Sequence, residues 1–205
     1  MEGAVLQYRT IASPSEGLYK EKGSKFLGFA FPVTNESDIN QRLEELRKLH
    51  HQGRHHCYGW VLGVDDIRMR ANDDGEPTYS AGKPILSQIE KLELTGTLVV
   101  VVRYFGGTKL GVGGLIQAYR AAAEAALNQS HILTLDVVSS YQLLFPYAAM
   151  NDVMSLVKQL ELETSAHKFE LSCEMRVKVP REKLESFTKG SAEIQELRLN
   201  KLQDD

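Results

Sequence analysis

Residues 99–119 read VVVVRYFGGTKLGVGGLIQAY, and the rest of the chain is organised around this stretch. Its four consecutive valines predict a strand buried on both faces of a sheet, because β-branched side chains suit a pleated surface and no polar residue alternates with them. Five glycines follow between Gly106 and Gly114, and glycine permits positive φ and the close approach of another group. Apolar residues then recur at helical spacing from Leu115 to about Leu127. The stretch therefore predicts a strand, a shaped loop and a helix whose N-terminal amides can bind an anion.

Composition and charge limit the classes of protein to which this chain can belong. The 205 residues carry a formal net charge of −3, so a nucleic acid would have to be bound by a local basic patch and not by bulk charge. The two cysteines, Cys57 and Cys173, lie far apart in the sequence and predict free thiols rather than a disulfide. No apolar run approaches the roughly 18 residues of a membrane span. We therefore expect a cytoplasmic protein that does not bind membranes.

The first two thirds of the chain alternate between strand and helix patterns. A helix is expected from an N-cap at Ser37 to about residue 50, and another from Pro84, a residue favoured at the first helical position, through Ile89. The turn-forming run from Asn72 to Pro77 predicts a loop. Aromatic-rich and alternating segments predict strands over 7–13, 17–33, 54–62, 63–71 and 132–135.

Near Val138 the pattern restarts. Strands are expected over 139–145, 163–169, 171–179 and 194–199, and helices over 150–160 and from Pro180 to Gly190. The strand over 171–179 alternates strictly, which predicts one solvent-exposed face. The order β-α-β-β-α-β is that of the split βαβ, ferredoxin-like arrangement. The sequence therefore predicts an α+β chain of two domains, residues 1–138 and 139–205.

Two clusters of polar residues precede the central stretch. Asp73, Asp74 and Glu76 are either paired carboxylates for acid–base chemistry or magnesium binding, or a surface turn, and their turn-forming neighbours favour the turn. His55 and His56 invite a metal interpretation. Adjacent residues of a strand point to opposite faces, however, and no second ligand pair accompanies them. We therefore predict no metal site.

The glycine loop matches neither a Walker A motif nor a dinucleotide-binding fingerprint, because the required glycine and Lys-Ser/Thr offsets are missing. Between Thr95 and Ala123 the charged residues are all basic, which makes the loop a candidate phosphate-binding patch, with aromatic residues beside it to stack on bases. Tight packing of the helix on the sheet is the alternative explanation of the glycines. The candidate phosphate- and RNA-binding residues are Arg54, Lys83, Arg103, Tyr104, Lys109, Gly111, Gly113 and Gly114, with Phe105 as a further stacking residue.

Four blocks of the sequence together resemble the motifs of the IMPACT family. They are Arg54–Cys57, Asp73–Pro77, Ala81–Leu86 and Val100–Leu115, and their order and spacing match over most of residues 17–130. The resemblance implies an N-terminal domain with the fold of ribosomal protein S5 domain 2. It also implies a C-terminal ferredoxin-like domain similar to domain V of elongation factor G. Eukaryotic members of the family modulate translation by interfering with the activation of a stress kinase, and the architecture of two-domain bacterial members implies nucleic-acid or ribosome binding by analogy of fold.

We therefore expect a translation-linked RNA- or ribosome-binding regulatory protein without catalysis, cofactor or metal. Its basic residues would contact phosphates, and the amides of Gly111–Gly114 would cradle one of them. The alternative is an enzyme that acts on a phosphorylated small molecule or nucleotide. In that enzyme the acidic loop would supply the base or a magnesium ligand, assisted by His55 or His56. A third possibility is a protein-interaction module that uses the open sheet face of the second domain.

Overall fold

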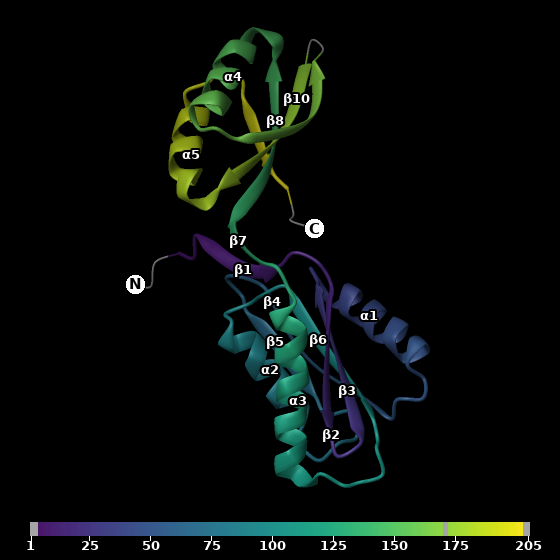
Figure 1. Ribbon diagram of the computed structural model, residues 1–205. Coiled ribbons are helices and arrows are strands. Elements are labelled where there is room, and N and C mark those ends of the chain that lie inside the picture. The colour runs from purple at the N-terminus through teal and green to yellow at the C-terminus, as the bar shows by residue number, and fades with distance from the viewer. Residues whose placement is uncertain (1–3, 170–171, 203–205) are drawn as a thin grey trace. The chain divides into compact units, whose positions relative to one another are not determined.

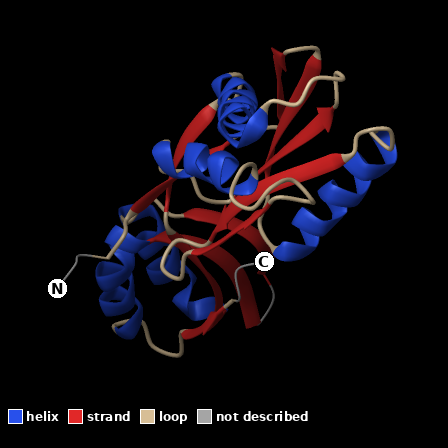
Figure 2. Cartoon of the chain, turned by 90° about the horizontal axis from the view of Figure 1, so that it is seen from below, coloured by secondary structure: helices blue, strands red, loops and turns tan. Residues whose placement is uncertain are grey.

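The computed structural model describes residues 4–169 and 172–202, and it divides into two compact units. The first unit is formed by residues 8–135, and the second by the described residues from 136 onward together with residues 4–7. Each unit combines helices with its own sheet (Figure 1 and Figure 2). The predicted α+β class with two units is therefore confirmed. A separate two-stranded sheet pairs β1 (Gln7–Ile11) with β7 (Ile132–Asp136).

The first unit is built on a five-stranded sheet in which all neighbouring strands are antiparallel. In spatial order the strands are β2 (Ser15–Glu21), β3 (Ser24–Pro32), β6 (Thr97–Tyr104), β4 (His55–Leu62) and β5 (Arg68–Asn72). The helices of this unit are α1 (Glu36–Leu49), α2 (Gly82–Lys91) and α3 (Gly111–Asn128). The central strand of the sheet is therefore β6, the valine strand of the opening stretch.

Strand β6 is buried on both faces, as its four valines predict. Val99 and Val101 belong to the core that α2 and α3 complete, whereas Val100 and Val102 belong to the core that α1 completes. The helices accordingly lie on opposite faces of the sheet, with α1 on one side and α2 and α3 on the other (Figure 1). This double cover explains the absence of polar alternation in the strand.

Helix α3 packs directly on the backbones of β2 and β3. Gly17 and Gly28 are register partners in these strands. A Cβ atom on Gly28 would collide with the carbonyl oxygen of Ala122, and one on Gly17 would collide with the backbone of Ala125 and Ala126. The tight helix-on-sheet packing that the sequence offered as an explanation of the loop glycines is thus provided by these two strand glycines and the alanines of α3.

Two expectations for the start of the chain are corrected. The segment expected as one strand over 17–33 is interrupted by a tight turn at Lys22 and Gly23, whose φ angles are 44° and 80°. The N-cap of helix α1 lies two residues earlier than expected, because the side chain of Asn35, and not that of Ser37, accepts a hydrogen bond from the backbone amide of Asp38.

The starts of α2 and α3 also differ from expectation. Pro84 is the third residue of α2 and not the first. The helix can start earlier because the Asp73 carboxylate, nine residues from Gly82, accepts hydrogen bonds from the amides of Ala81 and Gly82. Helix α3 begins at Gly111, inside the segment expected as loop. Three of the five loop glycines therefore belong to its first turn.

The second unit has the predicted β-α-β-β-α-β order. Its elements are β8 (Val138–Pro146), α4 (Met150–Gln159), β9 (Glu163–Phe169), β10 (Ser172–Pro180), α5 (Leu184–Ala192) and β11 (Arg198–Lys201), with short 3₁₀ turns η1 (Tyr147–Ala149) and η2 (Arg181–Lys183). The antiparallel sheet order is β11-β8-β10-β9, which is the ferredoxin-like arrangement. One sheet face packs against the two helices, and Glu174, Arg176 and Lys178 lie on the other face, as the alternation of β10 predicts.

The end of this unit departs from expectation. Helix α5 continues through Gly190 to Ala192, and the last strand begins at Arg198 and not at 194. Gly190 lies inside the helix and not at its end. It is a packing residue, because a Cβ atom there would collide with the side chain of Leu156 in α4. Leu171, where the alternating strand was expected to begin, lies outside the described residues.

Candidate nucleic-acid interface

In the first unit, the acidic loop and the glycine-rich loop lie at the same end of the sheet. Strand β6 ends beside the starts of β3 and β4, where Tyr104 pairs with Lys25 and Arg103 pairs with His55. Residues 73–81 lead from β5 into α2, and residues 105–110 lead from β6 into α3. We call residues 50–54, 73–81 and 105–110, with the strand and helix ends that they join, the loop end of the sheet.

Glu76 ties the two loops together from inside the protein. Its carboxylate oxygen Oε1 accepts hydrogen bonds from Arg103 Nη1 at 2.6 Å and from the Tyr119 hydroxyl at 2.7 Å. The Glu76 side chain is 4% exposed and that of Arg103 is 9% exposed. The Arg103 guanidinium also lies over the rings of Phe26 and Phe105. This cluster is a buried ion pair whose carboxylate is held by a tyrosine from α3.

The burial of this cluster changes the role of Arg103. A phosphate contact would require the guanidinium to reach solvent, but it is buried and paired with an internal carboxylate. Burial also raises the pKa of Tyr119 well above its ordinary value, so its hydroxyl remains a hydrogen-bond donor to Glu76. We therefore do not include Arg103 among the phosphate-binding residues that we propose.

The carboxylates of Asp73 and Asp74 accept hydrogen bonds from backbone amides. Asp73 accepts hydrogen bonds from the amides of Tyr79, Ala81 and Gly82 and so caps α2. Asp74 accepts one from the amide of His56 at 2.7 Å. These contacts occupy both oxygens of Asp73 and one of Asp74, and they favour the structural interpretation of the acidic loop over a catalytic or magnesium-binding one.

His55 and His56 occupy different environments, as their opposite directions in the strand predict. His55 Nδ1 lies 2.8 Å from the Asp74 carbonyl oxygen, so Nδ1 carries the proton and donates it. Its Nε2 lies 4.0 Å from Glu76 Oε1. His56 is buried, and desolvation lowers its pKa, with smaller opposing effects that include Asp74. Within the described residues, no three His, Cys, Asp or Glu side chains form a group that could hold a metal ion.

Cys57, next to the two histidines, is not an activated nucleophile. Its thiol is buried and donates to the Asp73 carbonyl oxygen at 3.0 Å. Burial raises the pKa of this thiol, so the thiolate is not formed near neutral pH. The Cys57 thiol is therefore held as a neutral hydrogen-bond donor to the Asp73 carbonyl oxygen.

The remaining predicted cations reach solvent. Arg54, Lys83 and Lys109 are exposed, and neither Arg54 nor Lys109 forms a salt bridge within the described chain. The ammonium of Lys83 lies 4.4 Å from the centre of the Tyr79 ring. The loop end therefore presents positive charge outward while its carboxylates are turned to internal donors.

The start of α3 is open. In the described structure its first turn contains no acidic residue and no capping side chain. Gly111 has a φ of 71°, and a Cβ atom on Gly111 or Gly113 would meet nothing within 4 Å. Tyr119 follows Gly111 by eight residues, so the helix start lies about 12 Å from the Glu76 cluster along the helix. It lies at the lower end of the unit in Figure 1.

The aromatic residues differ from expectation. Tyr104 is partly buried on the α1 side of the sheet, where its hydroxyl lies 2.9 Å from His50 Nδ1, so its ring is not free to stack on a base. Phe105 is 47% exposed. Sequence reasoning missed Tyr79, which is 62% exposed. Its position was the signal that could have identified it, because Tyr79 lies two residues after the turn-forming run and four residues before Lys83.

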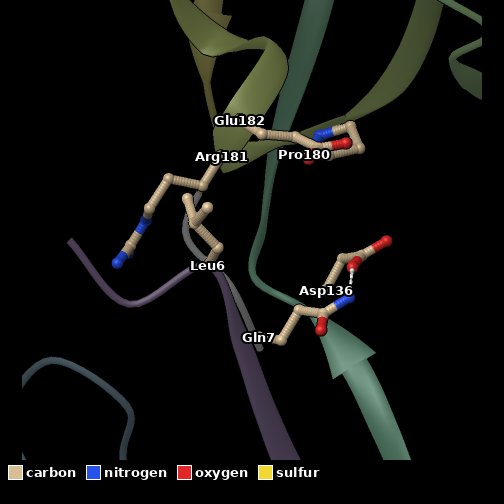
Figure 3. A pocket seen from close by; sticks show the side chains of 6 residues that line it. All are labelled: Leu6, Gln7, Asp136, Pro180, Arg181 and Glu182. Carbon is tan, nitrogen blue, oxygen red and sulfur yellow. Dashed lines mark hydrogen bonds between the residues drawn. The ribbon is translucent and has the colours of Figure 1, made fainter. Parts of the chain in front are cut away.

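The second unit contains a pocket. It has a volume of about 410 Å³ and is lined by Leu6, Gln7, Asp136, Pro180, Arg181 and Glu182 (Figure 3). The Gln7 amide donates to Asp136 at 2.7 Å, and Arg181 donates to the Val5 carbonyl oxygen at 2.8 Å. These contacts link the N-terminal segment to this unit, so the residues that line the pocket are engaged with one another. We therefore retain the loop end as the candidate nucleic-acid interface.

Comparison with known proteins shows the family of this chain. The family model for the Impact N-terminal domain matches residues 22–127, which is more than half of the chain. The chain belongs to the IMPACT family. The matched region includes the whole loop end. In the described residues no helix is long and apolar enough to cross a membrane.

Relatives within the IMPACT family cover different shares of the chain. The IMPACT family member YigZ of Escherichia coli (strain K12) is 30% identical over 185 residues, which are 89% of this chain and 91% of that protein. The IMPACT family member YvyE of Bacillus subtilis (strain 168) is 38% identical over 121 residues, so the match spans 59% of this chain and 56% of YvyE. The resemblance to the IMPACT family that the sequence motifs indicated is thereby confirmed.

A solved structure extends the likeness to the fold. The crystal structure of a hypothetical protein superimposes with a TM-score of 0.72 at 28% identity, and the match covers 98% of this chain and 100% of that one. Both units are therefore shared with a protein of known structure. That the first unit has the fold of ribosomal protein S5 domain 2 is implied by the IMPACT family resemblance.

Proposed function

We propose that this chain is a translation-linked, RNA-binding regulatory protein and that the loop end of its first unit is the RNA-binding surface. One observation carries the proposal: the carboxylates at this end are engaged by internal donors, while Arg54, Lys83 and Lys109 extend into solvent. Exposed cations in a chain of net charge −3 form the local patch that phosphate binding requires. The link to translation is what the family resemblance implies.

The start of α3 supplies a complementary part of the proposed surface. The amides of Gly111 and Gly113 lie among the first amides of an 18-residue helix, where they have no i−4 partner within the helix and the helix dipole favours an anion, and Gly114 lies beside them in the same turn. Lys109 precedes this turn by two residues. In our proposal these amides and Lys109 hold one RNA phosphate, and Arg54 and Lys83 hold others.

A second candidate function is an enzyme that acts on a phosphorylated small molecule. His55 favours it, because its Nδ1–H donates to a carbonyl oxygen and leaves Nε2 as a base whose side chain is 24% exposed. The acidic loop does not support this candidate, since Asp73 caps α2 and Glu76 is buried with Arg103. A thermal-shift screen of nucleotides and phosphorylated metabolites separates the two functions: a specific shift that His55→Gln abolishes would favour the enzyme.

The RNA proposal is tested with fluorescein-labelled RNA and fluorescence anisotropy. We expect Arg54→Ala and Lys109→Ala each to weaken binding by about five-fold, which corresponds to about 1 kcal/mol. Arg68→Ala is the matched control, because Arg68 is an exposed cation at the other end of β5, where it pairs with Glu36. Equal affinities for the three variants and the wild type would contradict the proposed surface, and the absence of RNA binding at low salt would contradict the function.

A further inference from the structure

Tyr79 has an unusual backbone conformation for an exposed aromatic residue. Its φ is 63°, in the left-handed region that disfavours residues with a bulky side chain. The conformation is held by Asp73, whose carboxylate accepts a hydrogen bond from the Tyr79 amide at 2.8 Å. The following residue is fixed too, since the Ser80 amide donates to the Pro77 carbonyl oxygen at 3.0 Å. Glycine would adopt this conformation without strain.

The ring of Tyr79 gains no core packing from this conformation. It is 62% exposed, and the Lys83 ammonium lies 4.4 Å from its centre. Phe105 repeats the arrangement, because its ring is 47% exposed and the Arg103 guanidinium lies 5.4 Å from its centre. The loop end therefore displays two exposed rings, each with a cation against it.

The two rings stand on loops that are tied together. Tyr79 lies in residues 73–81 and Phe105 begins residues 105–110. The ion pair at 2.6 Å joins Glu76 of the first segment to Arg103 of β6, two residues before Phe105. Both rings are consequently held at one end of one sheet by a buried contact. Such a fixed pair of aromatic surfaces differs from scattered exposed apolar residues, which are common on proteins.

We propose that Tyr79 and Phe105 stack on unpaired bases, so that the RNA bound at the loop end is single-stranded. This inference rests on the proposed function and adds the class of its ligand. Every base has a π-face that an aromatic ring can cover, whereas the bases of a duplex are already stacked on one another. Lys83 and the neighbouring exposed cations remain available to the phosphates that flank a stacked base.

The test compares a single-stranded RNA of about 12 nucleotides, within the usual size of such sites, with a duplex of the same sequence. Tyr79→Ala is expected to weaken single-strand binding about ten-fold, which is the loss of one stacked base, and to leave duplex binding unchanged. Tyr147→Ala is the matched control, since Tyr147 is 66% exposed and lies in the second unit. It should bind as the wild type does.

A second variant separates stacking from folding. Tyr79→Gly removes the ring and relieves the strained φ, so we expect a melting temperature equal to or above that of the wild type together with the same loss of RNA affinity. Tyr79→Trp should retain affinity, and its fluorescence should be quenched when the single strand binds.

Two results would overturn the inference. One is wild-type affinity of Tyr79→Ala for the single strand, and the other is a duplex that binds as tightly as the single strand. If either occurs while Arg54→Ala and Lys109→Ala still weaken binding, the proposed function stands and the stacking role is wrong. If the wild-type chain binds neither RNA, the proposed function itself fails.

Discussion

At the scale of single residues, Glu76 connects the acidic loop to the central strand and to α3. One of its oxygens accepts hydrogen bonds from Arg103 and Tyr119, which come from β6 and α3. The Arg103 Nε atom is buried without a hydrogen-bond partner in the described structure. The guanidinium therefore depends on this carboxylate for compensation of its charge.

Glu76→Gln should destabilise the protein by about 3 kcal/mol, because it leaves the charge of Arg103 buried and uncompensated. Urea unfolding followed by fluorescence measures the change. Glu45→Gln is the control: Glu45 forms an exposed ion pair with Arg42, and because solvent screens such a pair, its loss should leave stability close to that of the wild type. A Glu76→Gln variant as stable as this control would contradict the role of the cluster.

His56 should make stability depend on pH. Burial lowers its pKa below the ordinary 6.5, so the unfolded chain binds a proton more readily than the folded one. Stability is then fully present above pH 6.5 and decreases as the pH falls toward the folded-state pKa. We expect His56→Gln to flatten the dependence of the unfolding free energy between about pH 7 and pH 5. The His51→Gln variant, changed at an exposed histidine, is the control and should keep the pH dependence of the wild type. Identical pH dependences of the unfolding free energy in the two variants would contradict the role of His56.

The charged residues of the loop end were predictable from sequence, but their partners were not. Arg103 stands in an acid-free stretch, and that local composition suggested an exposed cation. Its partner Glu76 lies 27 residues earlier in the chain, and only the folding of two loops toward one sheet end brings them together. Tyr79 was missed for a related reason, because its backbone conformation depends on the carboxylate of Asp73.

At the scale of secondary-structure elements, the central strand and its helix follow from local pattern. The valines of β6 and the alanines of α3 match their positions in the core. The helix starts were less predictable. Asp73 caps α2 from a loop, and nothing within the helical segment signals a cap that comes from outside it. Gly17 and Gly28 were unassigned because their role depends on which helix lies over them.

Gly28→Ala tests the packing of α3 on β3. Its new methyl group would collide with the Ala122 carbonyl oxygen, and we expect a loss of about 1–3 kcal/mol. Gly113→Ala is the matched substitution, because its methyl group would meet open space at the start of α3. There the better helix propensity of alanine should keep stability equal or raise it by up to about 1 kcal/mol. Equal losses in a thermal melt of both variants would refute the packing model.

At the scale of the whole molecule, each unit has its own hydrophobic interior: the described residues of the first unit form one core on each face of its sheet, and those of the second unit form a single core. Trp60 is the single tryptophan and lies in the first unit, whereas Phe187 is fully buried in the core of the second. The two units therefore have separable spectroscopic signals. If the chain divides into two domains near residue 138, we expect the two units to unfold independently of each other.

Phe187→Ala should destabilise the second unit by about 3–5 kcal/mol, because it leaves a cavity in a closed core. If the units are independent domains, the tryptophan fluorescence transition keeps its wild-type midpoint while circular dichroism gains an earlier phase. A fluorescence midpoint that shifts together with the circular dichroism would show that the two units unfold as one.

The most direct test of the central claim is the salt dependence of single-stranded RNA binding by the full chain. We expect log K to fall linearly with log salt concentration. Replacing Arg54, Lys83 and Lys109 together by alanine should make this slope shallower by about 2, as expected for three lost phosphate contacts. An unchanged slope in the triple variant, or wild-type binding that does not respond to salt, would contradict the claim that the loop end binds RNA through these cations.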